Sequence, residues 1–96
     1  MPTSFADFIS ELDAEAHADG PDAVIELQAL SFRFSLARQL AARRHERRLT
    51  QKRLAQLSGV SQSAIGRIER GQGDPPMATL AALTRALEVD VQLVDR

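Results

Sequence analysis

Between residues 50 and 70 the chain carries polar side chains whose types and spacing suit contacts to nucleic acid. Gln62, Ser63 and Arg67 stand at positions that would share the outer side of one helix. Ile65 and Ile68, three residues apart, would turn the opposite side of that helix toward a core. Amide, hydroxyl and guanidinium groups can hydrogen-bond to the base edges that a major groove exposes. The pattern therefore indicates a helix that reads double-stranded DNA.

Charge is segregated along the sequence, although the formal net charge of the 96 residues is only −1. Residues 1–30 contain seven Asp and Glu and no Lys or Arg. Residues 31–73 contain ten Lys and Arg against two Glu, and residues 74–96 contain four acidic and two basic residues. A basic middle segment is what a binder of polyanions requires, whereas an acidic head suits a basic partner.

Composition excludes several classes of site. The chain has no cysteine, which excludes disulfides, thiolate metal sites and thiol nucleophiles. Hydrophobic residues make up 44% without any run long enough to span a bilayer, so we expect a globular protein that does not enter a membrane. The N-terminus lacks a signal-peptide pattern, and we expect a cytoplasmic protein. His17 and His45 lack neighbouring ligands, and no acid–base or nucleophilic set is suitably spaced, so we expect no metal, no cofactor and no enzyme.

Helical periodicity and capping signals predict five helices that would position the polar groups. Their expected ranges are about 4–18, 22–45, 50–58, 61–70 and 77–87. After the last helix Val89, Val91 and Leu93 alternate with other, mostly polar residues, which predicts a short C-terminal strand.

The third and fourth predicted helices would be joined by a tight turn. Ala55 is small enough to let the next helix pass close to the first. Gly59 can supply the left-handed backbone that such a turn needs, and Val60 would fill the angle between the two helices. This is the arrangement of a helix-turn-helix motif.

The sequence resembles the lambdoid-repressor (Cro/C1, XRE) family of helix-turn-helix domains over about residues 33–89. The resemblance is carried by Leu49-Thr50-Gln51, Leu54-Ala55, Gly59-Val60-Ser61-Gln62-Ser63, Ile65, Arg67-Ile68-Glu69-Arg70-Gly71, Pro75 and Leu80. It implies an all-α fold, namely a five-helix lambda-repressor-like domain with an acidic N-terminal helical extension and a short C-terminal strand. The expected divisions are an acidic extension over 1–30, the DNA-binding domain over 31–89 and a dimerisation tail over 90–96.

The resemblance also implies roles for individual residues. Gln51 would bond a phosphate, and Ser61 would cap the recognition helix or touch the DNA backbone. Arg44 would form a structural ion pair with Glu69. One departure is Gly66, which leaves a position inside the recognition helix without a side chain. The full DNA-binding set expected is Gln51, Lys52, Ser61, Gln62, Ser63, Arg67 and Arg70.

The layout of the two ends is similar to a subset of that family, the HigA-type antitoxins. Such antitoxins bind a small basic ribonuclease toxin and repress their own promoter. We therefore expect a repressor that is also the antitoxin of a type II toxin–antitoxin pair. An apolar stripe in the acidic head would anchor the toxin, and its residues are Phe5, Phe8, Ile9 and Leu12.

A lone C-terminal strand would leave backbone groups unpaired, so we expect two copies to pair through Val89, Val91 and Leu93. The resulting homodimer would bind an inverted-repeat operator. Two alternatives remain open at this point. In the first, the chain would be a stand-alone phage-type regulator without a toxin. In the second, it would be an adaptor that uses the helix-turn-helix for protein contacts only.

Overall fold

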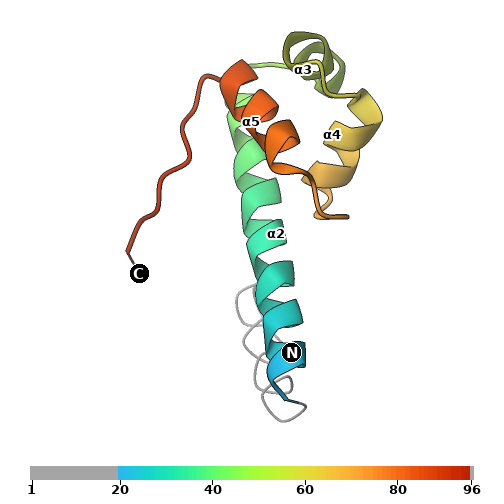
Figure 1. Ribbon diagram of the computed structural model, residues 1–96. Helices are drawn as coiled ribbons and strands as arrows, with labels where there is room; N and C mark the ends of the chain where they lie inside the picture. Colours follow the sequence, from blue (N-terminus) through green and yellow to red (C-terminus); the bar gives the residue numbers. More distant parts are fainter. Residues whose placement is uncertain (1–19, 96) are drawn as a thin grey trace, which may run out of the picture. The chain divides into compact units, whose positions relative to one another are not determined.

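A computed structural model describes residues 20–95 of the chain (Figure 1). Within this range the chain forms four α-helices, namely α2 (Pro21–Glu46), α3 (Gln51–Ser58), α4 (Gln62–Glu69) and α5 (Met77–Ala86). These bounds agree with the predicted ranges to within one or two residues. The chain divides into two compact units, Met1–Ser35 and Leu36–Arg96.

In the first unit, the described residues are Gly20 and the part of α2 that ends at Ser35. Asp22 lies in the first turn of α2, where a negative charge is favoured by the helix dipole. Leu27 is buried, whereas Ile25 and Phe32 are mostly exposed. The large apolar side chains of this part of α2 are therefore divided between a buried and an exposed face.

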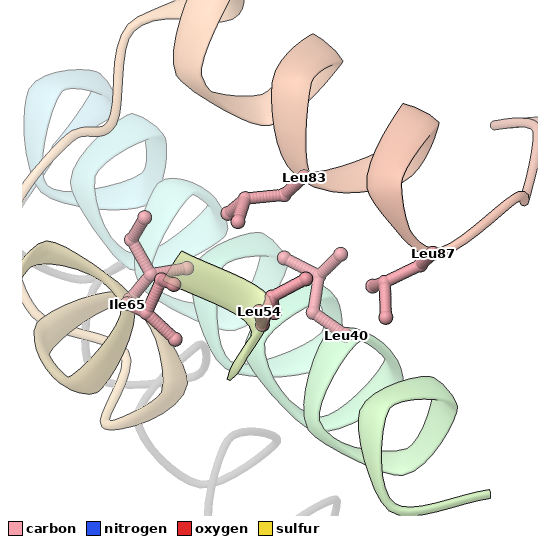
Figure 2. Close-up of a cluster of buried hydrophobic side chains, with 6 residues drawn as sticks. Leu40, Leu54, Ile65, Leu83 and Leu87 are labelled. Carbon is pink, nitrogen blue, oxygen red and sulfur yellow. The ribbon is translucent and has the colours of Figure 1, made fainter. Parts of the chain in front are cut away.

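The second unit is built around one apolar cluster, and each of the four helices contributes at least one side chain to it (Figure 2). Helix α3 contacts both α4 and α5. Each core side chain is at most 8% exposed, and burial of this kind is the main favourable term in folding. The cluster consists of Leu40, Leu54, Ile65, Ile68, Leu83 and Leu87.

Three of the helices end with the same backbone motif, in which one residue adopts a left-handed conformation. These residues are Arg48 (φ 55°), Gly71 (φ 71°) and Glu88 (φ 58°). In each motif the next N–H donates to the carbonyl oxygen five residues back, which satisfies a helix-end acceptor. The bonds run from Leu49 to Arg44, from Gln72 to Arg67 and from Val89 to Thr84, at 2.9–3.1 Å. Only Gly71 is of a residue type that signals such a turn from the sequence.

The prediction of five helices and a C-terminal strand is wrong. Residues 20–95 contain four helices and no strand, and the predicted helix over 4–18 lies outside the described residues. Val89 packs against the core, and its N–H donates to the carbonyl oxygen of Thr84, so Val89 belongs to the turn that ends α5. The residues after it, including the fully exposed Leu93, have no neighbouring strand among the described residues with which to pair. The all-α helix-turn-helix part of the prediction holds.

Candidate nucleic-acid interface

Helices α3 and α4 are joined by the three residues 59–61, and side chains cap both helices. The Thr50 hydroxyl accepts from the N–H of Arg53 at 3.0 Å, and Ser61 accepts from the N–H of Ala64 at 3.1 Å. Gly59 adopts φ 78° and its N–H donates to Ala55, which ends α3. Because the turn is short and both ends are capped, the angle between α3 and α4 is set locally.

Helix α4 has one buried and one exposed side. Ile65 and Ile68 enter the core, so the side chains on the opposite side of the helix face outward. Four of the predicted DNA-binding residues lie on this outer side and are exposed, namely Gln62, Ser63, Arg67 and Arg70. Their side chains offer amide, hydroxyl and guanidinium groups, which are the groups that read base edges.

The Arg67 side chain extends along the loop that follows α4. A Cβ atom added to Gly73 would lie 3.2 Å from Nη2 of Arg67, so the guanidinium passes close to this backbone. Gly73 has φ 71°, a conformation that disfavours other residues. The loop glycine thus provides both the backbone turn and the room beside Arg67.

A buried ion pair connects the end of α2 to the end of α4. Nε of Arg44 donates to Glu69 at 2.7 Å and Nη2 donates to its other carboxylate oxygen at 2.8 Å. The two side chains are only 9% and 10% exposed. Nη1 of Arg44 also donates to the carbonyl oxygen of Leu49 at 2.8 Å, which holds the segment that leads into α3. This bidentate geometry is the strong form of an arginine–carboxylate contact.

Gln51, in the first turn of α3, joins the same network. Its Nε2 donates to Glu69 at 3.1 Å, so one N–H of the amide that was expected to bond a phosphate is already used within the chain. Lys52 is next to it and exposed. The first turn of α3 therefore combines an amide held by a hydrogen bond with an exposed cationic side chain.

The network keeps Glu69 ionised. Burial by itself would raise the pKa of the Glu69 carboxyl. Hydrogen bonds from Arg44 and Gln51, with the charges of Arg44 and His45, outweigh burial, and the pKa lies below its ordinary value of 4.5. The hydrogen bond to Glu69 in turn raises the pKa of Arg44. Both members of the pair are charged at neutral pH.

Gly66 is the glycine inside the predicted recognition helix. It is buried, and a Cβ atom there would lie 3.2 Å from Nη1 of Arg70 and 3.6 Å from Oε1 of Gln51. Sequence reasoning missed this contact and the bond from Arg70 Nε to Oε1 of Gln72 at 3.3 Å. The available signal was a glycine in a helix interior, where glycine is normally unfavourable.

The remaining predicted sites are the toxin-binding and dimerisation residues. Phe5, Phe8, Ile9 and Leu12 lie outside the described residues. Val89 is partly buried against the core of its own chain, while Val91 and Leu93 are exposed. In the range 20–95 no group of three or more His, Asp or Glu could hold a metal ion, and no helix is long and apolar enough to cross a membrane.

Comparison with known proteins places this geometry in context. Residues 35–96 match the model of a helix-turn-helix domain family. An uncharacterized HTH-type transcriptional regulator of Haemophilus influenzae is 36% identical over 69 residues, which are 72% of this chain and 70% of that protein. The HTH-type transcriptional repressor RghR of Bacillus subtilis is 48% identical over 56 residues, or 57% of this chain and 42% of that protein.

A solved structure shows the same fold. The crystal structure of an HTH_3 family transcriptional regulator from Vibrio cholerae superimposes with a TM-score of 0.62 at 39% sequence identity. The match covers 65% of this chain and 35% of the Vibrio chain. This chain thus spans less than half of RghR and of the Vibrio protein, although it spans 70% of the Haemophilus relative.

Arg44 and Glu69 should be coupled more strongly than the two members of an exposed ion pair. We expect a double-mutant cycle with Arg44→Ala and Glu69→Ala, followed by urea denaturation, to give a coupling free energy above about 1 kcal/mol. The control is the exposed Arg43–Glu46 pair one residue along α2, whose side chains are 45% and 56% exposed. Its coupling should be roughly 0.5 kcal/mol or less. Equal coupling free energies in the two cycles would show that burial does not strengthen the Arg44–Glu69 interaction.

The lowered pKa of Glu69 should make stability depend on pH in the acidic range. The unfolded chain takes up a proton at Glu69 before the folded chain does, so stability is full above about pH 4.5 and falls as pH drops through the folded-state pKa. We expect the difference in unfolding free energy between wild type and Glu69→Gln to shrink from about pH 6 to about pH 3. Glu46→Gln, at an exposed position, is the control. A difference that stays constant over this range would refute the pKa assignment.

Proposed function

Because the chain belongs to the helix-turn-helix domain family, we propose that it is a sequence-specific DNA-binding transcriptional repressor whose helix α4 enters the major groove. The observation that carries the proposal is the division of α4 into two sides. Its apolar side is locked into the core, and its outer side presents Gln62, Ser63, Arg67 and Arg70 together. The types of these side chains suit hydrogen bonds to base edges in the major groove.

Basic side chains around α3 supply the sequence-independent part of binding. Arg44 and Arg43 are each engaged with a carboxylate of the chain. Arg47, Arg48 and Lys52 are exposed around the start of α3, where they would meet phosphates. Binding should therefore weaken as salt is added, because each phosphate contact releases counterions.

We also propose that the repressor acts as a homodimer on an inverted-repeat operator. Helix α4 has eight residues and can contact only a few base pairs, so one copy supplies little discrimination. Two copies related by a two-fold axis would place their α4 helices about 34 Å apart, one turn of DNA. The exposed apolar side chains of Val91, Leu93 and Val94 offer a surface for a second copy to cover.

A second proposed role is that of antitoxin, and the charge of the N-terminal segment favours it. Residues 1–30 carry seven acidic residues and no Lys or Arg, so phosphate would repel this segment. A ribonuclease is basic where it binds RNA, and an acidic segment would bind that surface. The acidic head would then neutralise a basic toxin while α4 binds the operator. A regulator of phage type without a toxin is the alternative.

Arg67 should read a base, whereas Lys52 should contact phosphate. Wild-type protein is first used to select sites from a double-stranded DNA library with a randomised core, and binding is then measured by fluorescence anisotropy. Arg67→Ala should lose discrimination of about 1–3 kcal/mol at one base pair in each half-site. Lys52→Ala should weaken binding to all DNA sequences by the same factor and reduce the salt dependence of binding. An equal loss at matched and mismatched sites for Arg67→Ala would refute base reading.

The antitoxin role can be separated from DNA binding in the full chain. A variant with Asp7, Glu11, Asp13 and Glu15 changed to Asn or Gln should still bind the selected DNA site. If a basic protein is encoded beside the gene for this chain, the variant should fail to bind it and should fail to relieve any growth arrest that its expression causes. If the neighbour is harmless when expressed alone, or the variant still protects cells fully, the antitoxin role is wrong while the repressor role stands.

A further inference from the structure

The glycine inside α4 has no backbone reason to be there. Gly66 is the fifth of the eight residues of the helix and is absent from the residues with positive φ, so its conformation suits any amino acid. Glycine lowers helix stability relative to alanine because it loses more conformational freedom on folding. The reason for a glycine at this position must therefore lie in the group that packs against it.

That space is filled by the head of Arg70. A Cβ atom at Gly66 would lie 3.2 Å from Nη1 and 3.9 Å from Cζ of Arg70, so the guanidinium lies across the glycine. The two residues are four apart on the helix, the spacing at which side chains meet on one face. Oε1 of Gln51 borders the same space at 3.6 Å. A Cβ atom at position 66 would be in tight contact with Nη1, so the guanidinium would have to shift by a few tenths of an ångström to admit it.

The guanidinium is also held from its other side. Nε of Arg70 donates to Oε1 of Gln72 at 3.3 Å, and the N–H of Gln72 donates to the carbonyl oxygen of Arg67 at 2.9 Å. Gln51 is itself held by its bond to Glu69. Arg70 thus folds back over Gly66 and lies between the side chains of Gln51 and Gln72. No acceptor from the described part of the chain binds its Nη1 or Nη2, and these atoms remain able to donate.

The surrounding surface is a shallow hollow in the predicted DNA-binding face. It has a volume of about 360 Å³ and is lined by Gln51, Gln62, Ser63, Gly66 and Arg70. Two parallel N–H donors of a guanidinium match the O6 and N7 acceptors of guanine, which is the commonest specific contact of arginine in a major groove. The Arg70 guanidinium lies in this hollow with the amides of Gln51 and Gln62 and the hydroxyl of Ser63.

We propose that Gly66 is the seat of the Arg70 guanidinium, and that the seated Arg70 reads a guanine at the base step that a side chain at position 66 would otherwise meet. The inference rests on the proposed DNA-binding function and adds a specificity-determining residue to it. Gly66 acts as a positioning residue, since it has no side chain and works through Arg70. Arg67 and Arg70 then read different base pairs of each half-site.

The test compares Gly66→Ala, Arg70→Ala and the double variant on the site selected by wild-type protein and on its single-base substitutions. Arg70→Ala should reduce discrimination about tenfold or more at one base pair of each half-site, different from the one that Arg67→Ala affects. Gly66→Ala should reduce discrimination at the same base pair as Arg70→Ala. Its melting temperature should equal or exceed that of wild type, because alanine is the better helix former and the displaced group is the end of a flexible side chain. In the Arg70→Ala background the Gly66 substitution should change discrimination no further.

Arg53→Ala is the matched control, because Arg53 is an exposed arginine whose Nη1 donates to Gln56 at 3.1 Å on α3, away from the hollow. It should change binding to every sequence by the same factor. Three results would overturn the inference alone, namely a uniform loss for Arg70→Ala, unchanged discrimination for Gly66→Ala, or additive effects in the double variant. If wild-type protein selects no preferred sequence at all, the proposed function fails and this inference fails with it.

Discussion

The bidentate pair between Arg44 and Glu69 is the interaction on which the arrangement of the DNA-binding unit depends. It joins the last turn of α2 to the last residue of α4, and the same arginine holds the carbonyl oxygen of Leu49 before α3 begins. Desolvating two charges costs about as much as their attraction returns, so the pair adds more to geometry than to net stability. Each partner nevertheless needs the other, because an unpaired buried charge is costly. The contacts of Arg44 with Glu69 and with Leu49 therefore connect the end of α2 to α4 and to the segment that leads into α3.

The same contact links the core to the proposed DNA-binding face. Glu69 follows Ile68 of the core and accepts a hydrogen bond from Gln51, whose amide borders the hollow above Gly66. The orientation of a polar group on the outer face is thus determined by a charged group that is nearly buried. A binding face built in this way is preorganised, and less side-chain entropy is lost when DNA is bound.

Glycine serves two different purposes around α4. Gly59 and Gly71 have positive φ and end helices, so their role is in the backbone. Gly66 has ordinary helical backbone, and its role is the room it leaves for Arg70. Gly73 combines both properties, since it has positive φ and lies against Arg67. The two arginines of the outer face therefore each lie next to a glycine.

The sequence by itself determined the helix-turn-helix, because its signals are local. The caps Thr50 and Ser61, the turn at Gly59 and the three-residue spacing of Ile65 and Ile68 act within a few residues of one another. The Arg44–Glu69 partnership was expected from a family resemblance, since 25 residues separate the two positions and no local pattern connects them. The tail was misjudged because alternation indicates a strand only when a partner strand exists, and Val89 is instead drawn into the core at the end of α5. The contacts of Arg70 with Gly66 and Gln72 were decided by tertiary structure alone. They depend on where a long, flexible side chain comes to rest among groups from α3, α4 and the following loop.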